Sequence, residues 1–316
     1  MKKRLTVLSL ILVFALTMAM TGCGAGGANL TFETGGSQGT YYAYGTVLAE
    51  YVSNQAGINV TAITGNGSQA AVEDLDAGDV QLAFCQSDVA SYAYQGTNLF
   101  EAPVDSFSAL AALYMEDVQI VTCDSAIKTA ADLKGKTVSV GVQGSGVYFN
   151  AIDVLSAYDM TLDDINPVYQ NFGDSTESLK DNKIDAAFVV AGAPTNSITE
   201  LSTAKQAYIV SIDDEHIDKL LAMSPYYSKH VISKDCYGTD EDAVTVAVAA
   251  MVLVRDDVDE ETVYNITKTI FDGKQDIQHG KAAELDPSFA ASIDSVPFHA
   301  GAAKYFSEQG FEVATK

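Results

Sequence analysis

The chain of 316 residues is long enough for two modest domains or one large one, and its formal net charge is −24. Such an acidic chain lacks the basic face that nucleic-acid phosphates require, and anionic lipid headgroups would repel it. A small anionic ligand is not excluded, because its binding depends on the local site rather than on the bulk charge.

An export signal is predicted at the start of the chain, over residues 1–22. Basic residues open it, a mostly apolar stretch follows that is too short for a comfortable membrane span, and it ends in Met20-Thr21-Gly22-Cys23. Small residues before a lone cysteine resemble the cleavage site of a bacterial lipoprotein, so Cys23 is predicted to carry a lipid. Residues 23–29 are small and suit a flexible tether. We therefore expect an extracytoplasmic protein that a lipid alone anchors to the bacterial cell membrane.

The first predicted site element is a glycine-rich turn, Gly35-Gly36-Ser37-Gln38-Gly39-Thr40-Tyr41-Tyr42. It follows a short apolar strand at residues 30–32 and opens a helix whose apolar positions recur at residues 44, 47, 48, 51 and 52. Glycines let backbone N–H groups approach a ligand, and the unpaired N–H groups of a helix N-terminus suit an anion. A single turn of this kind is also an ordinary structural feature, so its repetition along the chain carries more weight.

Strands that end in polar or glycine-rich turns, each followed by a helix, recur along the chain. Strands at residues 59–63 and 80–84 run into helices that begin at Ser68 and at Gln86-Ser87-Asp88. Strands at residues 137–142, 165–170 and 184–190 run into helices that begin at Gly144-Ser145-Gly146, at Ser175 and at Ala193-Pro194-Thr195. This alternation predicts an α/β fold with parallel strands and right-handed crossovers.

Two long apolar segments, at residues 107–123 and 244–254, depart from this alternation. Neither shows a helical stripe, so we predict two long strands that link two lobes. Residues 30–117 then form the first part of lobe 1, and residues 118–230 form lobe 2. Residues 231–316, which are mainly helical in pattern after the second long strand, return to lobe 1.

The six strand-to-helix turns provide the candidate site. In an open parallel sheet such turns lie at the carboxyl ends of the strands, so three turns from each lobe would face one another across a cleft. Each serine or threonine in these turns could instead be an ordinary helix cap, and each aromatic side chain could belong to the core. The predicted ligand-binding residues are Gly36, Ser37, Gln38, Thr40, Tyr41, Ser68, Gln86, Asp88, Gln143, Ser145, Phe172, Ser175, Ala193, Pro194 and Thr195.

Two residues bear on the charge of the ligand. Arg255 is the only arginine after the export signal, and it follows the end of a strand, so a guanidinium clamp on a carboxylate is not expected. Backbone N–H groups and hydroxyls must then hold an anion. Asp88 leaves two interpretations open: it caps the following helix, or it meets a ligand ammonium group, which would favour an amino acid over an oxo-acid.

The sequence shows no catalytic constellation. Gly135-Lys136-Thr137 lacks the earlier glycine of a phosphate loop and precedes a strand, and Gly144-Ser145-Gly146 does not have the spacing of a nucleophile elbow. The four histidines are scattered without metal-ligand spacing. We predict a binding protein rather than an enzyme, with no cofactor, no metal site and no nucleic-acid partner.

After the export signal, nearly the whole chain resembles the TAXI-type solute receptors of TRAP (tripartite ATP-independent periplasmic) transporters. The resemblance is carried by residues 35–42, Gly67-Ser68, residues 78–88, residues 183–188 with Gly192-Ala193-Pro194, residues 244–254 with Val263-Tyr264, and residues 296–306. Two positions depart from the pattern: Ala300 stands where members often carry Pro, and Asn182 where many carry Gly.

The resemblance implies a two-lobed type II periplasmic-binding-protein fold, with two parallel-rich sheets, flanking helices and two crossing strands. It also implies capture of a small carboxylate, either a glutamate-like amino acid or a small organic acid, and delivery to TRAP-type membrane permease subunits driven by an ion gradient. Two other interpretations stay open. The protein could be a ligand-sensing input protein for a membrane signalling kinase, or an enzyme on a binding-protein scaffold.

Overall fold

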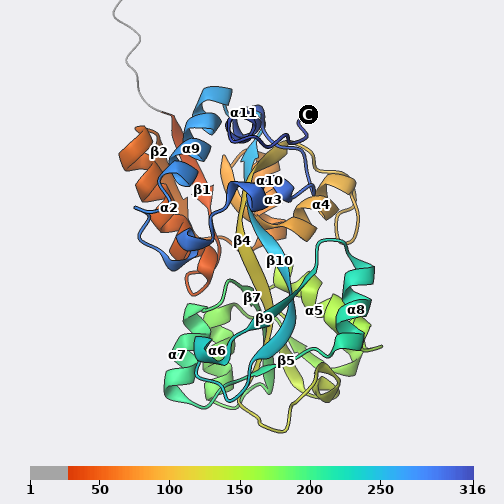
Figure 1. Cartoon of the computed structure of the whole chain (residues 1–316). Helices are drawn as coiled ribbons and strands as arrows, with labels where there is room; N and C mark the ends of the chain where they lie inside the picture. The colour runs from red at the N-terminus through yellow and green to blue at the C-terminus, as the bar shows by residue number, and fades with distance from the viewer. Residues whose placement is uncertain (1–27) are drawn as a thin grey trace, which may run out of the picture.

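The computed structural model describes residues 28–316. The predicted export signal, the predicted lipidation site Cys23 and most of the predicted tether lie outside this part of the chain. Figure 1 shows two lobes, one above the other, and two long strands, β4 (Phe107–Thr122) and β10 (Ala243–Arg255), that run from one lobe into the other. The prediction of a two-lobed α/β fold with two crossing strands is confirmed.

The first lobe, at the top of Figure 1, contains both the beginning and the end of the described chain. Its early elements are β1 (Asn29–Glu33), α2 (Thr40–Ala56), β2 (Asn59–Ile63), α3 (Ser68–Ala77), β3 (Leu82–Gln86) and α4 (Ser87–Gln95). Its late elements are α9 (Glu260–Asp272), the 3-10 helix η5 (Gly280–Glu284), α10 (Pro287–Ser292) and α11 (Ala300–Glu308).

The second lobe is formed by the middle of the chain. Its helices are η2 (Ala130–Leu133), α5 (Gly146–Ala157), η3 (Leu162–Asp164), α6 (Phe172–Lys180), α7 (Asn196–Ala204), α8 (Asp214–Met223) and η4 (Lys234–Cys236). Its strands, apart from the two crossing strands, are β5 (Thr137–Ser139), β6 (Asn166–Val168), β7 (Ala186–Ala191), β8 (Tyr208–Val210) and β9 (Ser228–Ile232).

The strands form one mixed sheet in the order β2-β1-β3-β10-β4-β7-β5-β6, with β8 beside β4 and β9 beside β10. The β1–β2, β1–β3, β5–β6 and β5–β7 pairs are parallel, as the alternation of strands and helices predicts. The crossing strands β4 and β10 run antiparallel to each other and to their neighbours β3 and β7. They therefore join the two parallel parts into a continuous ten-stranded sheet.

Hydrophobic packing divides along the crossing strands. The core of the first lobe includes residues 107–114 of β4 and 249–254 of β10, packed with α2, α9 and α11. The cores of the second lobe include Val118, Ile120 and Val121 of β4, and they take in β10 up to Val248. Between these cores β4 carries two buried acidic residues, Glu116 and Asp117, each 2% exposed. The lobe limits placed at residues 117 and 230 from the sequence stay predictions.

Two helix starts differ from the expectation that a serine caps each helix. Ser68 is the first residue of α3 rather than its cap, and its hydroxyl accepts a hydrogen bond from the Gln86 N–H at 3.1 Å. The helix predicted to begin at Ser175 begins at Phe172. The reason is that the Asn171 side chain accepts the Asp174 N–H and caps the helix four residues before Ser175.

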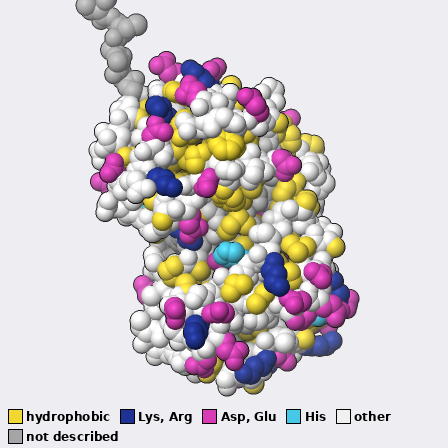
Figure 2. Space-filling view, in the orientation of Figure 1, with side chains coloured by type: hydrophobic (Ala, Val, Ile, Leu, Met, Phe, Trp, Pro, Cys, Tyr) yellow, Lys and Arg dark blue, Asp and Glu magenta, His cyan; other side chains and the backbone are white. Residues whose placement is uncertain are grey.

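The surface agrees with the acidic composition. Figure 2 shows Asp and Glu side chains spread over the visible face of both lobes, with Lys and Arg side chains between them, and the outline of the molecule narrows between the lobes. Among residues 28–316, no helix combines the length and the apolar character needed to cross a bilayer.

Candidate functional site

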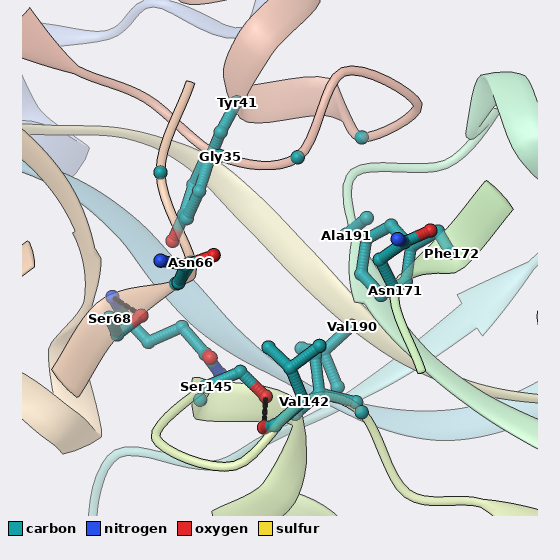
Figure 3. Close-up of a pocket in the computed structure, with 18 of the residues that line it drawn as sticks. Gly35, Tyr41, Asn66, Ser68, Val142, Ser145, Asn171, Phe172, Val190 and Ala191 are labelled. Atoms are coloured by element: carbon teal, nitrogen blue, oxygen red, sulfur yellow. Dashed lines mark hydrogen bonds between the residues drawn. The ribbon is translucent and has the colours of Figure 1, made fainter. Parts of the chain in front are cut away.

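A cavity of about 150 Å³ lies between the two lobes. The first lobe contributes the turn at residues 35–41, the turn at residues 65–68, and Gln86 at the end of β3. The second lobe contributes residues 141–147, 170–172 and 190–191, and β4 contributes Glu116. Figure 3 shows Ser68 and Ser145 close together on one side of the cavity, with Asn171 and Phe172 on the other. The strand-to-helix turns of the two lobes therefore meet at one cavity.

Four helices begin at the cavity wall, because each follows a strand that ends there. They are α2, α3, α5 and α6, and their first residues Thr40, Ser68, Gly146 and Phe172 all line the cavity. Neither α2 nor α3 has a side-chain cap, although the Gln69 N–H at the start of α3 donates to the Gly144 carbonyl. Helix N-termini carry partial positive charge and unpaired N–H donors. The cavity therefore offers a setting for an anion without an arginine.

Glycines allow the lobes to touch at the rim of this cavity. A Cβ atom added at Gly67 would lie 2.9 Å from the Cβ of Ser145, which belongs to the other lobe. A Cβ atom added at Gly146 would overlap Oε1 of Gln86, again across the lobes. Real side chains could not occupy these positions without moving the opposite wall, so the structure is the closed arrangement of the two lobes.

Hydrogen bonds also cross between the lobes at the cavity. The Thr40 hydroxyl donates to the Gly192 carbonyl at 2.8 Å, and the Gln69 N–H donates to the Gly144 carbonyl at 3.1 Å. Because each bond joins one lobe to the other, each can form only when the lobes are closed.

The floor of the cavity is formed by acidic and phenolic side chains. Glu116 is 2% exposed, and burial raises the pKa of its carboxyl to about 8, opposed in part by the nearby Tyr41 and Tyr114 hydroxyls and by the charge of Lys281. The Tyr114 hydroxyl donates to Oε1 of Glu116 at 3.1 Å. The Tyr41 ring stacks on Phe84 with centroids 4.5 Å apart, and its hydroxyl has no hydrogen-bond partner among the described residues. In Figure 3 this ring extends from α2 toward the end of the cavity where Asn66 lies.

Asp88 lies in a buried network behind the cavity rather than on its wall. Its Oδ2 accepts from the Asn150 side-chain amide at 2.8 Å, and the Oδ1 of Asn150 accepts from Gln86 at 2.6 Å. The same amide of Asn150 donates to the Tyr227 hydroxyl, which in turn donates to Asp153. Complete burial raises the pKa of Asp88 to about 7. The network links α4 of the first lobe to α5 of the second.

Seven of the fifteen predicted site residues line the cavity: Gly36, Thr40, Tyr41, Ser68, Gln86, Ser145 and Phe172. Asp88 is not a helix cap either, since Gln86 holds that position at the start of α4. Pro194 precedes Thr195, the N-cap of α7, and so is not the first residue of that helix.

The other predicted residues lie away from the cavity wall. Ser37 and Gln143 are exposed, and Gln38 lies against Gly173 at the start of α6. Ser175 is buried inside α6 and bonds to Ser139. Of the remaining turn, Pro194 is exposed, Ala193 packs on the second-lobe core, and Thr195 accepts a hydrogen bond from the Gln119 side chain.

Several cavity residues were not among the predicted ones. Asn66 and Asn171 stand in strand-to-helix turns, so the same pattern that selected the serines could have found them. Gln170 lies directly before Asn171, and its Oε1 is buried without a hydrogen-bond partner among the described residues. Glu116 gave a different signal, because it is an acidic residue in the middle of a long apolar strand. Within residues 28–316, no group of three or more His, Cys, Asp or Glu side chains is arranged to hold a metal ion.

The fold and the cavity together define a class of protein: two α/β lobes of the periplasmic-binding-protein kind, with a candidate site between them. Residues 32–310 match the NMT1-like family over most of the chain, and the protein belongs to that family.

Solved structures with a similar fold share little sequence with this chain. One is PhnD1 from Prochlorococcus marinus (MIT 9301) in complex with methylphosphonate, with 10% identity, a TM-score of 0.53, and coverage of 80% of this chain and 87% of that one. A second is the GluR0 ligand-binding core in complex with L-glutamate, with 11% identity, a TM-score of 0.51, and coverage of 83% and 100%. A third is a putative L-cystine ABC transporter protein from Listeria monocytogenes, with 14% identity, a TM-score of 0.50, and coverage of 84% and 97%. At such identities the likeness concerns the fold alone.

Proposed function

We propose that this protein is an extracytoplasmic solute-binding receptor that captures a small carboxylate, either a glutamate-like amino acid or a small organic acid. The observation that carries the proposal is the convergence of four helix N-termini on one cavity between two lobes. Unpaired N–H groups and the positive ends of helix dipoles bind anions without further assistance.

The hydrogen-bond donors at the cavity determine how an anionic solute would be bound, because no arginine of residues 28–316 lines it. Arg255 bonds to Asp257 at 2.9 Å and lies beside Gly78 on the first lobe, so it does not reach the cavity wall. Backbone N–H groups, the hydroxyls of Ser68 and Tyr41, and the side-chain amide of Asn66 are donors at the cavity. Each hydrogen bond to a charged group nets roughly 1.5–3 kcal/mol. Several of them, less the cost of ordering, reach about 8 kcal/mol, which corresponds to roughly micromolar affinity.

The cavity also limits the size of the solute. Its volume of about 150 Å³ is close to that of an engineered protein cavity that holds one benzene molecule. We therefore expect a solute of roughly six to ten non-hydrogen atoms, the size of a small amino acid or dicarboxylate.

Capture would proceed by closure of the lobes. The contacts at Gly67 and Gly146 and the Thr40 to Gly192 hydrogen bond join the two lobes only when they are closed. A solute that touches both walls adds interactions to the closed form alone, and so shifts the open–closed equilibrium toward it. The crossing strands β4 and β10 are the continuous connections about which the lobes would rotate.

We further propose that the receptor is of the TAXI type, that a lipid on Cys23 anchors it to the bacterial cell membrane, and that it delivers its solute to a TRAP-type permease. The resemblance at residues 35–42 and 78–88 supports the receptor type. The division into residues 30–117, 118–230 and 231–316 belongs to the same proposal.

A thermal-shift screen tests the binding function. A solute that binds the folded protein raises its melting temperature by mass action, so small mono- and dicarboxylates and amino acids should include at least one stabilising compound. The proposal fails if no small anion stabilises the protein and a neutral sugar does.

The partner is tested in proteoliposomes that hold the candidate permease. Uptake that requires the receptor and an ion gradient supports the TRAP assignment, whereas uptake that requires ATP contradicts it.

A further inference from the structure

Two buried oxygen atoms stand out in a cavity that is otherwise rich in N–H donors. Glu116 places a carboxyl group at the cavity, 98% removed from solvent, on the stretch of β4 between the two hydrophobic cores. The Oε1 of Gln170, on the second-lobe wall, is buried with no donor among the described residues. A simple carboxylate such as succinate supplies only acceptors, so it cannot donate to the Gln170 oxygen or to the Glu116 carboxyl. A solute that also carries N–H donors can satisfy both.

The Tyr41 hydroxyl, which lies near the Glu116 carboxyl, is a second group with no hydrogen-bond partner among the described residues. Tyr41 is 9% exposed and lines the cavity. It is therefore free to donate to the anionic part of a solute or to accept from its nitrogen. Unpaired buried polar atoms cost free energy in a folded protein, so the two at this cavity, Gln170 Oε1 and the Tyr41 hydroxyl, indicate that the occupant supplies their partners.

We propose that the solute carries a protonated nitrogen as well as an anionic group, and that Glu116, assisted by Gln170, is the residue that binds this nitrogen and selects against analogues that lack it. This inference rests on the proposed function, which it narrows to amine-bearing solutes. It also moves the role of ammonium partner from Asp88, which bonds to Asn150 behind the cavity, to Glu116.

Binding of an ammonium group by Glu116 should also release a proton. Because burial raises the pKa of this carboxyl to about 8, it is mainly protonated at pH 7. Pairing with an ammonium group requires the ionised form, so binding must release close to one proton at pH 7 and less at higher pH. The titratable or charged groups that face Glu116 are Tyr41 on α2, Cys85 on β3, Tyr114 and Asp117 on β4, and Lys281 on η5.

The alternative arrangement uses the same residues differently. A protonated Glu116 could donate its own hydrogen to a carboxylate of the solute, in which case the nitrogen would be unnecessary and no proton would be released. The two arrangements predict opposite results for matched pairs of solutes that differ only in the amine.

Calorimetry on the full-length receptor distinguishes them. The probes are L-glutamate with 2-oxoglutarate and glutarate, L-aspartate with succinate, and L-alanine with pyruvate, each titrated at pH 7 in two buffers of different ionisation enthalpy to count protons. We expect the amine-bearing member of at least one set to bind at least about tenfold more tightly, with proton release that its partner does not cause. Glu116→Gln, which is nearly isosteric and can still accept from Tyr114, should abolish both the preference and the release.

Asp88→Asn serves as the matched control, since it neutralises a buried carboxyl that does not line the cavity. It should change the affinity of both members of a pair by the same factor. Equal or tighter binding of the oxo-acid or deaminated member to the wild type overturns the inference while leaving the proposed function intact, and so does discrimination that survives in Glu116→Gln. Proton release is measured on the wild type, so the test stands even if that variant folds poorly. If no member of any pair binds, both the inference and the proposed function are wrong.

Discussion

Gly146→Ala adds one methyl group at the contact between the lobes. Gly146 is the first residue of α5 and has ordinary backbone angles, so alanine is tolerated there and should even favour the helix slightly. In the closed structure, however, the new Cβ would overlap Oε1 of Gln86 and lie 3.1 Å from the hydroxyl of Ser68, both on the other lobe. The substitution therefore acts against closure and not against the fold of either lobe.

The loss of affinity expected for Gly146→Ala depends on which atoms must move to admit the new methyl group. Gln86 cannot turn aside freely, because its amide donates to Asn150 at 2.6 Å inside the buried network. Overpacking of one methyl group costs about 1–3 kcal/mol, and loss of the Gln86 hydrogen bond adds about 0.5–1.5 kcal/mol. A closed form destabilised by about 1.5–4.5 kcal/mol binds its solute roughly 10- to 2,000-fold more weakly.

Calorimetry with the best compound from the thermal-shift screen measures the affinity, and urea unfolding without solute measures stability. Gly280→Ala is the matched control, since Gly280 also begins a short helix and an added Cβ there meets no atom within 4 Å. We expect weaker binding by Gly146→Ala, no change for the control, and equal stability of both variants without solute. Wild-type affinity in Gly146→Ala would refute the view that the solute is held in this closed arrangement.

Three further predictions concern single side chains. Tyr41→Phe removes a hydroxyl with no hydrogen-bond partner among the described residues. Urea unfolding should therefore show no loss of stability in the solute-free protein, while calorimetry should show an affinity about 3- to 10-fold lower. A loss of stability with unchanged affinity would assign Tyr41 to the core. Thr40→Val removes the hydrogen bond to Gly192 across the lobes, and calorimetry should show an affinity about 2- to 10-fold lower, with no change taken as evidence that this bond does not support closure. Burial beside Asp74 raises the pKa of Glu33, so the stability this carboxyl contributes is present at acid pH and is lost as pH rises through the raised pKa. Glu33→Gln should therefore reduce the loss of unfolding free energy between pH 6 and pH 9 by about 1–2 kcal/mol, after allowance for solvent screening, and parallel curves for the two proteins would contradict it.

The layout of strands and helices could be predicted from the sequence because its signals are local. Apolar runs that end in glycine or serine turns mark β1, β2 and β3 and the helices after them within a few residues. The crossing strands were also predictable, since both are long apolar segments without a helical stripe and β10 is rich in β-branched residues. Strand β9 (Ser228–Ile232) was not predicted, because four of its five residues are exposed and it carries no buried alternation to reveal it.

The pairing of the crossing strands was beyond the sequence pattern. β4 and β10 lie more than 120 residues apart in the chain and pair antiparallel, which makes one continuous sheet out of the two that were expected. No residue in either strand marks its partner, because both strands are apolar on both faces. For the same reason the sequence could not predict on which face of the sheet the Glu116 side chain lies. An acidic residue within an apolar strand nevertheless indicates a buried charge or a site.

The sequence predicted the candidate site best where a serine or an aromatic residue stands in or beside a strand-to-helix turn. Ser68, Ser145 and Phe172 lie in or beside strand-to-helix turns, and all three line the cavity. Ser175 and Asp88 were selected by the same rule and lie elsewhere, because the helices α4 and α6 begin earlier than a serine or aspartate cap would indicate. The rule finds the end of the sheet where a solute would bind, but it does not resolve single residues.

The glycines show why the site can be located without knowing how it works. The sequence suggests that glycines at the turns let backbone N–H groups approach a ligand. At Gly36 a Cβ atom would meet nothing within 4 Å, so the space there is open to a solute. At Gly67 and Gly146 the same space is filled by the other lobe, so these two glycines serve closure instead. Substitutions at the two kinds of glycine should therefore separate contact with the solute from movement of the lobes: a larger residue at Gly36 should change which solutes bind, whereas a larger residue at Gly146 should weaken all of them alike.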